Sequence, residues 1–337
     1  MSGHEKVLYT FTGGADGGSP SACPCASLAR DAAGNLYGTT YEGGAASGSA
    51  GFGVVYALDP AGQETVLYTF IGGADGANPE GGVVRDPAGN LYGTTLFGGA
   101  DGQGIVFKVD PSGQETVLHT FTGGADGGGP TSGVVLDPAG NLYGTTPGGG
   151  PAGAGVVYML NPSGQQTVLY GFSGYGAPST PFAGVTLDRA GNVYGVAANG
   201  GITSTGGAGE GAVYKIDTAG NFSAIYTFTG GADGGLPQSN VVLDSAGNVY
   251  GVTNAGGVVY KISPSDQFVV LYTFSDGSGP TSLLLGGPGV IYGTGLGGAL
   301  TGGFLFELQF ALKRKPEWRP RSLSIAWGRP GRACHRR

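Results

Sequence analysis

The segment DPAGNLYGTT, residues 86–95, decides the fold because close copies of it return along the whole chain. Its Tyr recurs as Tyr37, Tyr92, Tyr143, Tyr194, Tyr250 and, in a degenerate copy, Tyr292. A Val-Leu-Tyr-Thr-Phe signature ends at Phe11, Phe70, Phe121, Phe172, Phe228 and Phe274. A third, Val-Val-Tyr/Phe, has its aromatic residue at Tyr56, Phe107, Tyr158, Tyr214, Tyr260 and Phe306. Central copies lie 51 residues apart, which predicts a repeat architecture.

Each repeat contains four short β-type runs. In the second repeat these are residues 83–86, 91–95, 105–109 and 116–121, rich in β-branched and aromatic residues. Asp86, Pro87 and Gly89 fit the preferred positions of a type I turn between the first two runs. Four antiparallel strands and a period near 50 are typical of a β-propeller blade. The sequence therefore predicts an all-β, six-bladed propeller.

The repeat region begins and ends at different points within the repeat unit. Residues 7–11 match a fourth strand, and residues 304–308 match a third strand that has no fourth strand after it. Pairing of residues 7–11 with the last blade would close the ring and leave no free sheet edge. We therefore expect one propeller domain over residues 1–310, closed in this way, and a separate tail over residues 311–337.

Composition and charge separate the tail from the repeats. Gly (73) and Pro (20) are abundant, but most glycines fall at repeated turn positions, as an ordered glycine-rich repeat requires. Residues 1–312 contain 7 Lys/Arg and 22 Asp/Glu, whereas residues 313–337 contain 9 basic residues and only Glu317. Blocks of like charge are usually disordered, so we expect a disordered tail. An acidic propeller is not expected to bind nucleic acid.

Targeting signals and cysteine content say little about where the protein is located. The chain shows no signal peptide after Met1 and no apolar run long enough to span a membrane. Three Cys cannot make a disulfide framework, so the redox state of Cys23 and Cys25 stays open. A monomer is expected, since closing the ring uses up the sheet edges.

Loop lengths predict which face binds. The Asp-to-Asn hairpin and the connection from third to fourth strand keep nearly constant lengths, whereas the other two connections vary. Variable loops on one face are typical of a binding surface. Binding candidates there are the residues that follow a Pro near the channel, Glu80, Thr131, Gln238 and Thr281, together with Tyr41 and Tyr175, which could stack on a sugar or peptide.

Catalytic and metal-binding signals are weak. No catalytic residue can be assigned, because His119 replaces a repeated Tyr and no Ser–His–acid set is suggested. Asp16, Asp75, Asp126 and Asp233 recur at one loop position and are weak calcium candidates. One carboxylate per blade does not supply the six to eight oxygens of a calcium site, so we interpret them as turn formers and expect no cofactor.

The unit quoted above, followed by Gly-Gly and then Gly-x-Val-Phe/Tyr-Lys-x-Asp, resembles the GloVer tandem repeat of bacterial surface-type proteins. The resemblance covers roughly residues 5–310 and implies an extracellular or cell-surface location, although we recognise no leader or anchor pattern of such proteins in residues 1–337 and therefore expect none within them. The Asp-x-x-Gly-Asn-x-Tyr hairpin is also similar to that of lactonase-like propellers.

Two functional hypotheses follow. The first is a non-catalytic binding or structural module whose ligand is a polysaccharide or a protein at the variable-loop face. The alternative is a metal-dependent hydrolase or lyase of the lactonase-like type that uses the central channel near Glu80. The sequence favours the first, since the loops are rich in glycine backbone and poor in reactive side chains.

Overall fold

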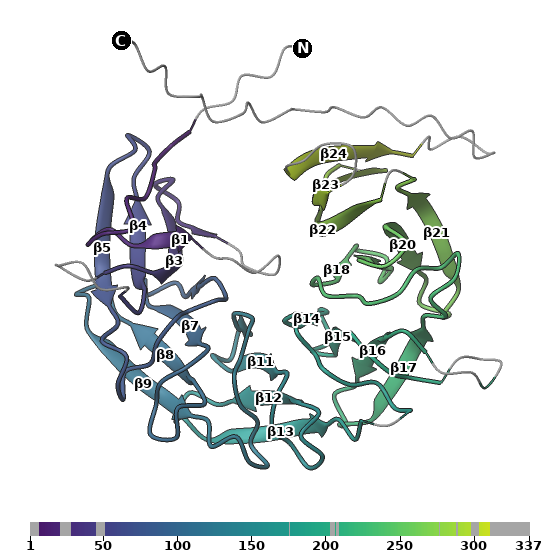
Figure 1. Cartoon of the computed structure of the whole chain (residues 1–337), viewed down its shortest axis with the longest axis horizontal. Coiled ribbons are helices and arrows are strands. Elements are labelled where there is room, and N and C mark those ends of the chain that lie inside the picture. The colour runs from purple at the N-terminus through teal and green to yellow at the C-terminus, as the bar shows by residue number, and fades with distance from the viewer. Residues whose placement is uncertain are drawn as a thin grey trace, which may run out of the picture.

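The computed structural model describes residues 7–20, 28–44, 51–174, 176–202, 206, 209–275, 277–287, 289–297 and 303–310. These residues form 24 strands and no helix, arranged as six antiparallel sheets around a centre (Figure 1). The six-bladed, all-β architecture is therefore confirmed. Because the described part of the chain contains no helix, it also contains none that could cross a membrane.

The blades follow one another along the chain. Blade 1 consists of β1 (Gly18–Pro20), β2 (Ala29–Arg30), β3 (Leu36–Glu42), β4 (Val54–Leu58) and β5 (Glu64–Thr69). Blade 2 consists of β6 (Val84–Arg85), β7 (Leu91–Thr95), β8 (Ile105–Val109) and β9 (Glu115–Thr120). Blade 3 consists of β10 (Val135–Leu136), β11 (Leu142–Thr146), β12 (Val156–Leu160) and β13 (Gln166–Gly171).

The second half repeats this pattern. Blade 4 consists of β14 (Thr186–Leu187), β15 (Val193–Ala197), β16 (Ala212–Ile216) and β17 (Phe222–Thr227). Blade 5 consists of β18 (Val242–Leu243), β19 (Val249–Val252), β20 (Val258–Ile262) and β21 (Phe268–Thr273). Blade 6 consists of β22 (Ser278–Leu285), β23 (Val290–Gly297) and β24 (Gly303–Gln309).

In the second strand of each blade a glycine follows the repeated tyrosine, and the aromatic residue opposite this glycine explains why it is needed. Gly93 pairs with Phe107 across β7 and β8, and a Cβ atom on Gly93 would lie 2.6 Å from Cζ of that ring. Gly144 and Tyr158 repeat this arrangement in blade 3. A glycine is needed here because the ring lies over the neighbouring backbone, where any side chain would collide with it.

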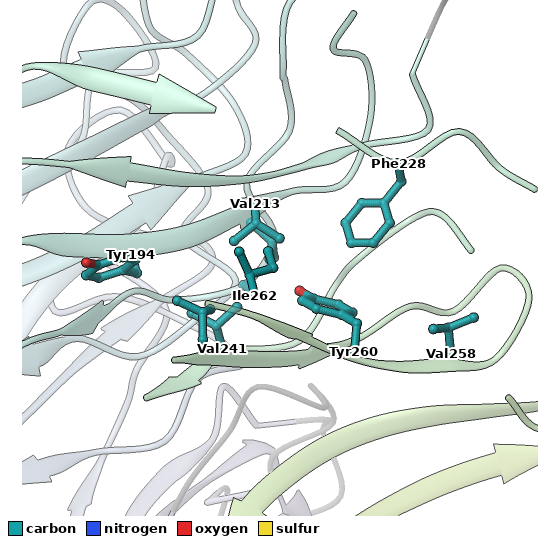
Figure 2. Close-up of a cluster of buried hydrophobic side chains, with 10 residues drawn as sticks. Tyr194, Val213, Phe228, Val241, Val258, Tyr260 and Ile262 are labelled. Carbon is teal, nitrogen blue, oxygen red and sulfur yellow. The ribbon is translucent and has the colours of Figure 1, made fainter. Parts of the chain in front are cut away.

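The same rings join neighbouring blades. Phe70, which follows β5, packs edge-on against Phe107 of the next blade with 5.2 Å between ring centroids, and both side chains are fully buried. Figure 2 shows the corresponding contact of Phe228 with Tyr260, inside a cluster that includes Val241 and Ile262. Loss of such a ring would cost about 3–5 kcal/mol, so these interfaces hold the blades together.

The predicted closure of the ring is corrected. Residues 7–11 form no strand, and blade 6 remains a three-stranded sheet whose edge strand is β24. Tyr9 and Phe11 pack on blade 1 instead, with the Phe11 ring 4.9 Å from that of Tyr56. The segment thus keeps the contact that a fourth strand makes with the following blade. That contact is close in sequence, whereas pairing with β24 must close a loop of nearly the whole chain.

The predicted division into residues 1–310 and 311–337 is not tested, because residues 311–337 lie outside the described residues. Six described sheets account for the repeats up to Phe310.

Candidate functional site

The four candidates near the channel lie one to a blade. Glu80 and Thr131 precede the inner strands of blades 2 and 3, Gln238 precedes that of blade 5, and Thr281 lies in β22. All four side chains are partly exposed. No hydrogen bond joins any of them to another among the described residues, so the structure places them around a ring and does not gather them at one point.

Local backbone geometry directs these side chains. Asn78, which precedes Pro79 and Glu80, has a φ of 55°, and Thr180 and Leu236 have φ values of 61° and 51° at the same place in blades 4 and 5. Left-handed non-glycine residues carry strain and persist only where their surroundings hold them. Here the carbonyl of Asn78 accepts a hydrogen bond from the Leu96 N–H at 3.1 Å, which holds the turn before the channel.

Three of the candidates are engaged in internal hydrogen bonds. The Thr131 hydroxyl donates to the carbonyl of Phe182 at 2.9 Å, and Gln238 accepts from the Asn254 side-chain amide at 2.7 Å. The Thr281 hydroxyl lies 2.8 Å from that of Thr294. These contacts tie neighbouring segments together, so the side chains have a structural use whether or not they meet a ligand.

Glu80 differs from the other three in its electrostatics. Burial raises the pKa of this carboxyl group above its ordinary value, because the charged form loses part of its hydration. A metal centre needs further ligands beside such a group. Among the described residues no three His, Cys, Asp or Glu side chains lie close enough to share a metal ion, and Cys25 lies outside those residues.

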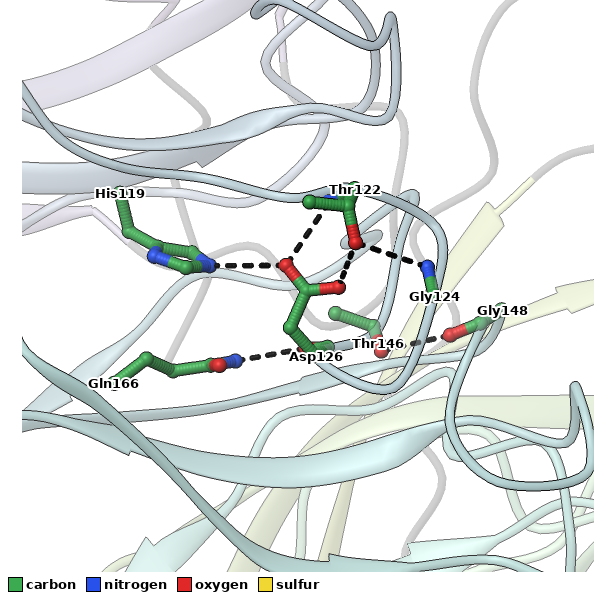
Figure 3. A network of polar contacts seen from close by, with 7 residues as sticks. All are labelled: His119, Thr122, Gly124, Asp126, Thr146, Gly148 and Gln166. Carbon is green, nitrogen blue, oxygen red and sulfur yellow. Dashed lines mark hydrogen bonds and ion pairs between the residues drawn. The ribbon is translucent and has the colours of Figure 1, made fainter.

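The four loop aspartates are fully occupied by their own loops. Figure 3 shows Asp126 accepting from the backbone N–H of Thr122 at 3.0 Å and from its hydroxyl, with His119 Nε2 3.4 Å away. In the equivalent loop Asp233 accepts from the hydroxyl of Tyr226 at 2.9 Å. These bonds support the interpretation as turn formers, and they leave few free oxygens for calcium.

Asp16 and Asp75 have the same arrangement, with Tyr9 and Tyr68 donating to them at 3.0 Å. Burial alone would raise the pKa of Asp16, but the hydrogen bonds from Thr12 and Tyr9 outweigh it and keep the pKa below its ordinary value. The Asp16 carboxylate is therefore held in the charged form as a structural acceptor.

The two tyrosine candidates have different outcomes. Tyr41 lies in β3 and not in a loop, and its carbonyl accepts from the Asn78 side chain at 2.9 Å. Its ring is partly exposed at the end of the strand that leads into the variable loops. Tyr175 lies outside the described residues.

An exposed apolar patch between blades 1 and 2 was not anticipated from the sequence. It consists of Phe52, Ile71 and Phe97, whose side chains are 41 %, 75 % and 48 % exposed. The backbone of residues 77 and 78 is hydrogen-bonded to the segments of both Phe52 and Phe97. The carbonyl of Phe52 accepts from the Asn78 N–H at 2.8 Å, and Phe97 exchanges two backbone hydrogen bonds with Ala77. We call this set of three side chains the blade 1–2 patch.

Phe52 lies with one face of its ring on the backbone. A Cβ atom on Gly72 would lie 2.4 Å from Cε2 of that ring and 2.6 Å from both Cδ2 and Cζ. Three neighbouring ring atoms at nearly equal distance mean that the ring presents its face to Gly72. The side chain is 41 % exposed, so part of the ring remains accessible for stacking.

The other repeats do not share this patch. Residues in the place of Phe52 are identified by the same backbone hydrogen bond and are Gln103, Ala154 and Glu210. Those in the place of Phe97 make the same isolated bridge and are Gly148, Asn199 and Ala255. Thr12, Thr122 and Thr229 occupy the place of Ile71. Comparing the repeats with one another at these loop positions would have revealed the patch from sequence.

Among the described residues positive charge lies on one face only, where it is mixed with aspartates such as Asp86 and Asp137. The described variable loops, including the end of β3, contain eight acidic residues and no Lys or Arg: Asp16, Glu42, Asp75, Glu80, Asp101, Asp126, Glu210 and Asp233. The described Lys and Arg residues lie in or beside the hairpins of the opposite face, as do Arg85, Arg189 and Lys215. The variable-loop face is therefore purely anionic.

The hairpin side of the channel contains a cavity of about 1040 Å³ between the inner strands of blades 3 to 6. Val135, Thr186 and Val242 line it, and the buried Oδ1 atom of Asn240 has no hydrogen-bond partner among the described residues. Its wall combines these aliphatic side chains with the charged residues Asp137, Asp188 and Arg189.

Solved structures similar to this chain share its fold. Virginiamycin B lyase from Staphylococcus aureus matches with a TM-score of 0.56 and 12% sequence identity, covering 88% of each chain. A catalytically inactive variant of that lyase with quinupristin matches with a TM-score of 0.59 and 12% identity, covering 87% of this chain and 83% of the other. At such identity the likeness concerns the propeller fold alone.

Sequence comparisons identify the repeat itself. No curated protein matches the chain significantly. The family model for the Gloeobacter/Verrucomicrobia repeat matches residues 1–208, which is more than half of the chain and includes the blade 1–2 patch. The chain therefore belongs to the Gloeobacter/Verrucomicrobia repeat family.

Proposed function

We propose that the protein is a non-catalytic propeller that binds an extracellular polymer, a polysaccharide or a protein, through its variable-loop face. The observation that carries this proposal is the blade 1–2 patch. Exposed aromatic and aliphatic side chains occupy positions where the other repeats have polar or small residues, and exposed apolar patches on folded proteins mark interaction sites.

The surroundings of the patch suit a polymer better than a small substrate. Phe52 offers a partly exposed ring for stacking, and Asp101 and Gln103 lie on the loop beside Phe97 as hydrogen-bonding groups. Glu80, Thr131, Gln238 and Thr281 belong to the same face, and Tyr41 lies at its edge. Their mixed chemistry is typical of a recognition surface. A monomer at the cell surface, the location implied by the resemblance above, would present this face to cell-wall material.

Binding to a panel of immobilised bacterial cell-wall polysaccharides and purified surface proteins tests the proposal. The double variant Phe52→Ser/Phe97→Ser is expected to lose most of the binding. Val269→Ser changes an apolar side chain, 48 % exposed, on the outer strand β21 and is expected to bind normally. If folded, unmodified protein binds nothing on the panel, or if both variants bind alike, the patch is not the binding site.

The alternative is a metal-dependent hydrolase or lyase centred on Glu80. Its raised pKa is the one feature that suits an acid or base, and a raised pKa also follows from burial at a structural position. Turnover of lactones that disappears in Glu80→Gln, with folding intact, would favour this alternative over the binding module.

A further inference from the structure

The blade 1–2 patch combines two properties that select its partner. It is apolar at Phe52, Ile71 and Phe97, and it lies on a face whose described loops have no positive charge. A Phe ring face attracts cations as well as apolar groups. A complementary segment would therefore carry Lys or Arg together with aromatic side chains.

The chain itself contains such a segment. Residues 313–337 carry nine Lys/Arg, one Glu and both tryptophans of the protein, Trp318 and Trp327. Residues 1–312 carry a net charge of −15, from 7 basic and 22 acidic residues. The charge of +8 on the segment thus complements the acidic propeller, and its tryptophans complement the exposed rings.

The segment is long enough to reach the patch. Residues 311–337 follow Phe310, directly after β24 of blade 6. Blades 6 and 1 stand at the two ends of an open arc in Figure 1, with a gap between them. An extended chain of this length spans about 90 Å. A domain of about 300 residues is roughly 50 Å across, so the reach exceeds the path over the surface.

We propose that residues 313–337 bind to the blade 1–2 patch of their own propeller, with a tryptophan against Phe52 and Phe97 and basic side chains against the surrounding carboxylates such as Asp101. The hairpin face is a poorer alternative for this segment, because its aspartates are mixed with arginines such as Arg85 and Arg189, whereas the charged side chains of the described variable loops are all acidic. This inference extends the proposed function, since an external polymer would then compete with the segment for one surface.

The distribution of tryptophan makes a direct test possible. Because residues 1–312 contain no Trp, the tryptophan fluorescence of the full chain reports only on residues 313–337. The emission maximum and the quenching by acrylamide are measured for the full chain and for a synthetic peptide of residues 313–337. The full chain is expected to emit at shorter wavelength and to be quenched several-fold less than the peptide.

Two sets of variants locate the contact. In Phe52→Ser/Phe97→Ser the fluorescence is expected to return toward that of the peptide, whereas the matched control Val269→Ser is expected to keep the fluorescence of the unmodified chain. Arg319→Gln/Arg321→Gln changes only the segment, so it tests the charge contacts even if the patch variant folds poorly. Added NaCl is expected to loosen the contact, because it screens exposed charges.

The proposal is overturned if the full chain and the peptide have the same emission and quenching. It is also overturned if the patch variant, shown to be folded by circular dichroism, keeps the fluorescence of the unmodified chain, since the segment would then bind elsewhere. Neither readout needs an external ligand. If no polymer ligand is found, the fluorescence test of residues 313–337 still applies. If the fluorescence test fails, polymer binding by the propeller is not contradicted.

Discussion

Glu115 offers the sharpest test of how the blades are held together. It is the first residue of β9, half-buried, and its Oε1 atom is buried without a hydrogen-bond partner among the described residues. Gln166 takes the same position in blade 3, where its side-chain amide donates to the carbonyl of Asp126 in the preceding loop at 2.7 Å. A protonated Glu115 can make the same bond to Asp75, whereas an ionised one cannot.

The pKa of Glu115 decides which form is present. Burial and the nearby charge of Asp75 raise this pKa to about 7, from an ordinary value of 4.5. Because the folded state holds the proton more tightly than the unfolded state, stability falls as pH rises from about 4.5 to about 7 and then levels off. The full shift corresponds to about 3.4 kcal/mol, and solvent screening at a half-buried side chain reduces this to about 1–2 kcal/mol.

Glu115→Gln removes the titration and supplies a permanent donor. The variant is expected to match the unmodified protein near pH 4.5 and to unfold at a temperature about 1.5–3 °C higher at pH 8.5. Thermal unfolding followed by circular dichroism across this range measures the effect. Gln166→Glu is the reciprocal control and should introduce the same loss of stability in blade 3. Parallel pH profiles for the unmodified protein and Glu115→Gln would refute the reasoning.

Four further outcomes are expected. His119→Tyr restores the hydroxyl that other repeats aim at the loop aspartate and should raise the free energy of unfolding in urea by about 0.5–1.5 kcal/mol; no gain would contradict this. Tyr158→Phe removes a buried hydroxyl without a partner, and since Phe107 fills the same place in blade 2, stability in urea should not fall. Asp137→Ala removes bonds from Asn141 and Tyr143 and should cost about 1–3 kcal/mol at pH 7, with a smaller cost in acid where the carboxylate is protonated. Calcium should leave the melting temperature of the unmodified protein unchanged, because the loop carboxylates already accept internal hydrogen bonds; a clear rise that chelation reverses would contradict this.

Repetition made most of the fold predictable. Six copies of each signature average out the ambiguity of any one short strand, so the strand order and the blade count followed from spacing alone. The Asp-to-Asn hairpins were predictable for the same reason, and in the structure Asp86 accepts from Asn90 and Tyr92 as such a turn requires. The interpretation of the loop aspartates as turn formers stays a prediction, which their hydrogen bonds from Tyr and Thr support.

The candidate site was less predictable. Glu80, Thr131, Gln238 and Thr281 were placed by their spacing from a repeated turn, which fixes the blade but not the neighbours of a side chain. Phe52 lies four residues before Tyr56, and Phe97 lies five residues after Tyr92, so counting along the sequence matches both to their counterparts in other repeats. Counting does not show that their side chains are exposed or that one segment bonds to the backbone of both, and these features exist only in the folded ring.

The amino-acid sequence by itself determined the period, the six blades, the turn chemistry and the opposite charges of repeats and tail, because each depends on residues near one another in the chain. Only the tertiary structure decided that residues 7–11 stay on blade 1, that Glu115 faces a loop of the previous blade, and that Phe52, Ile71 and Phe97 meet on one surface. These features depend on side chains that differ from one repeat to the next, and their neighbours are set by packing in space, which the period of the repeat does not specify.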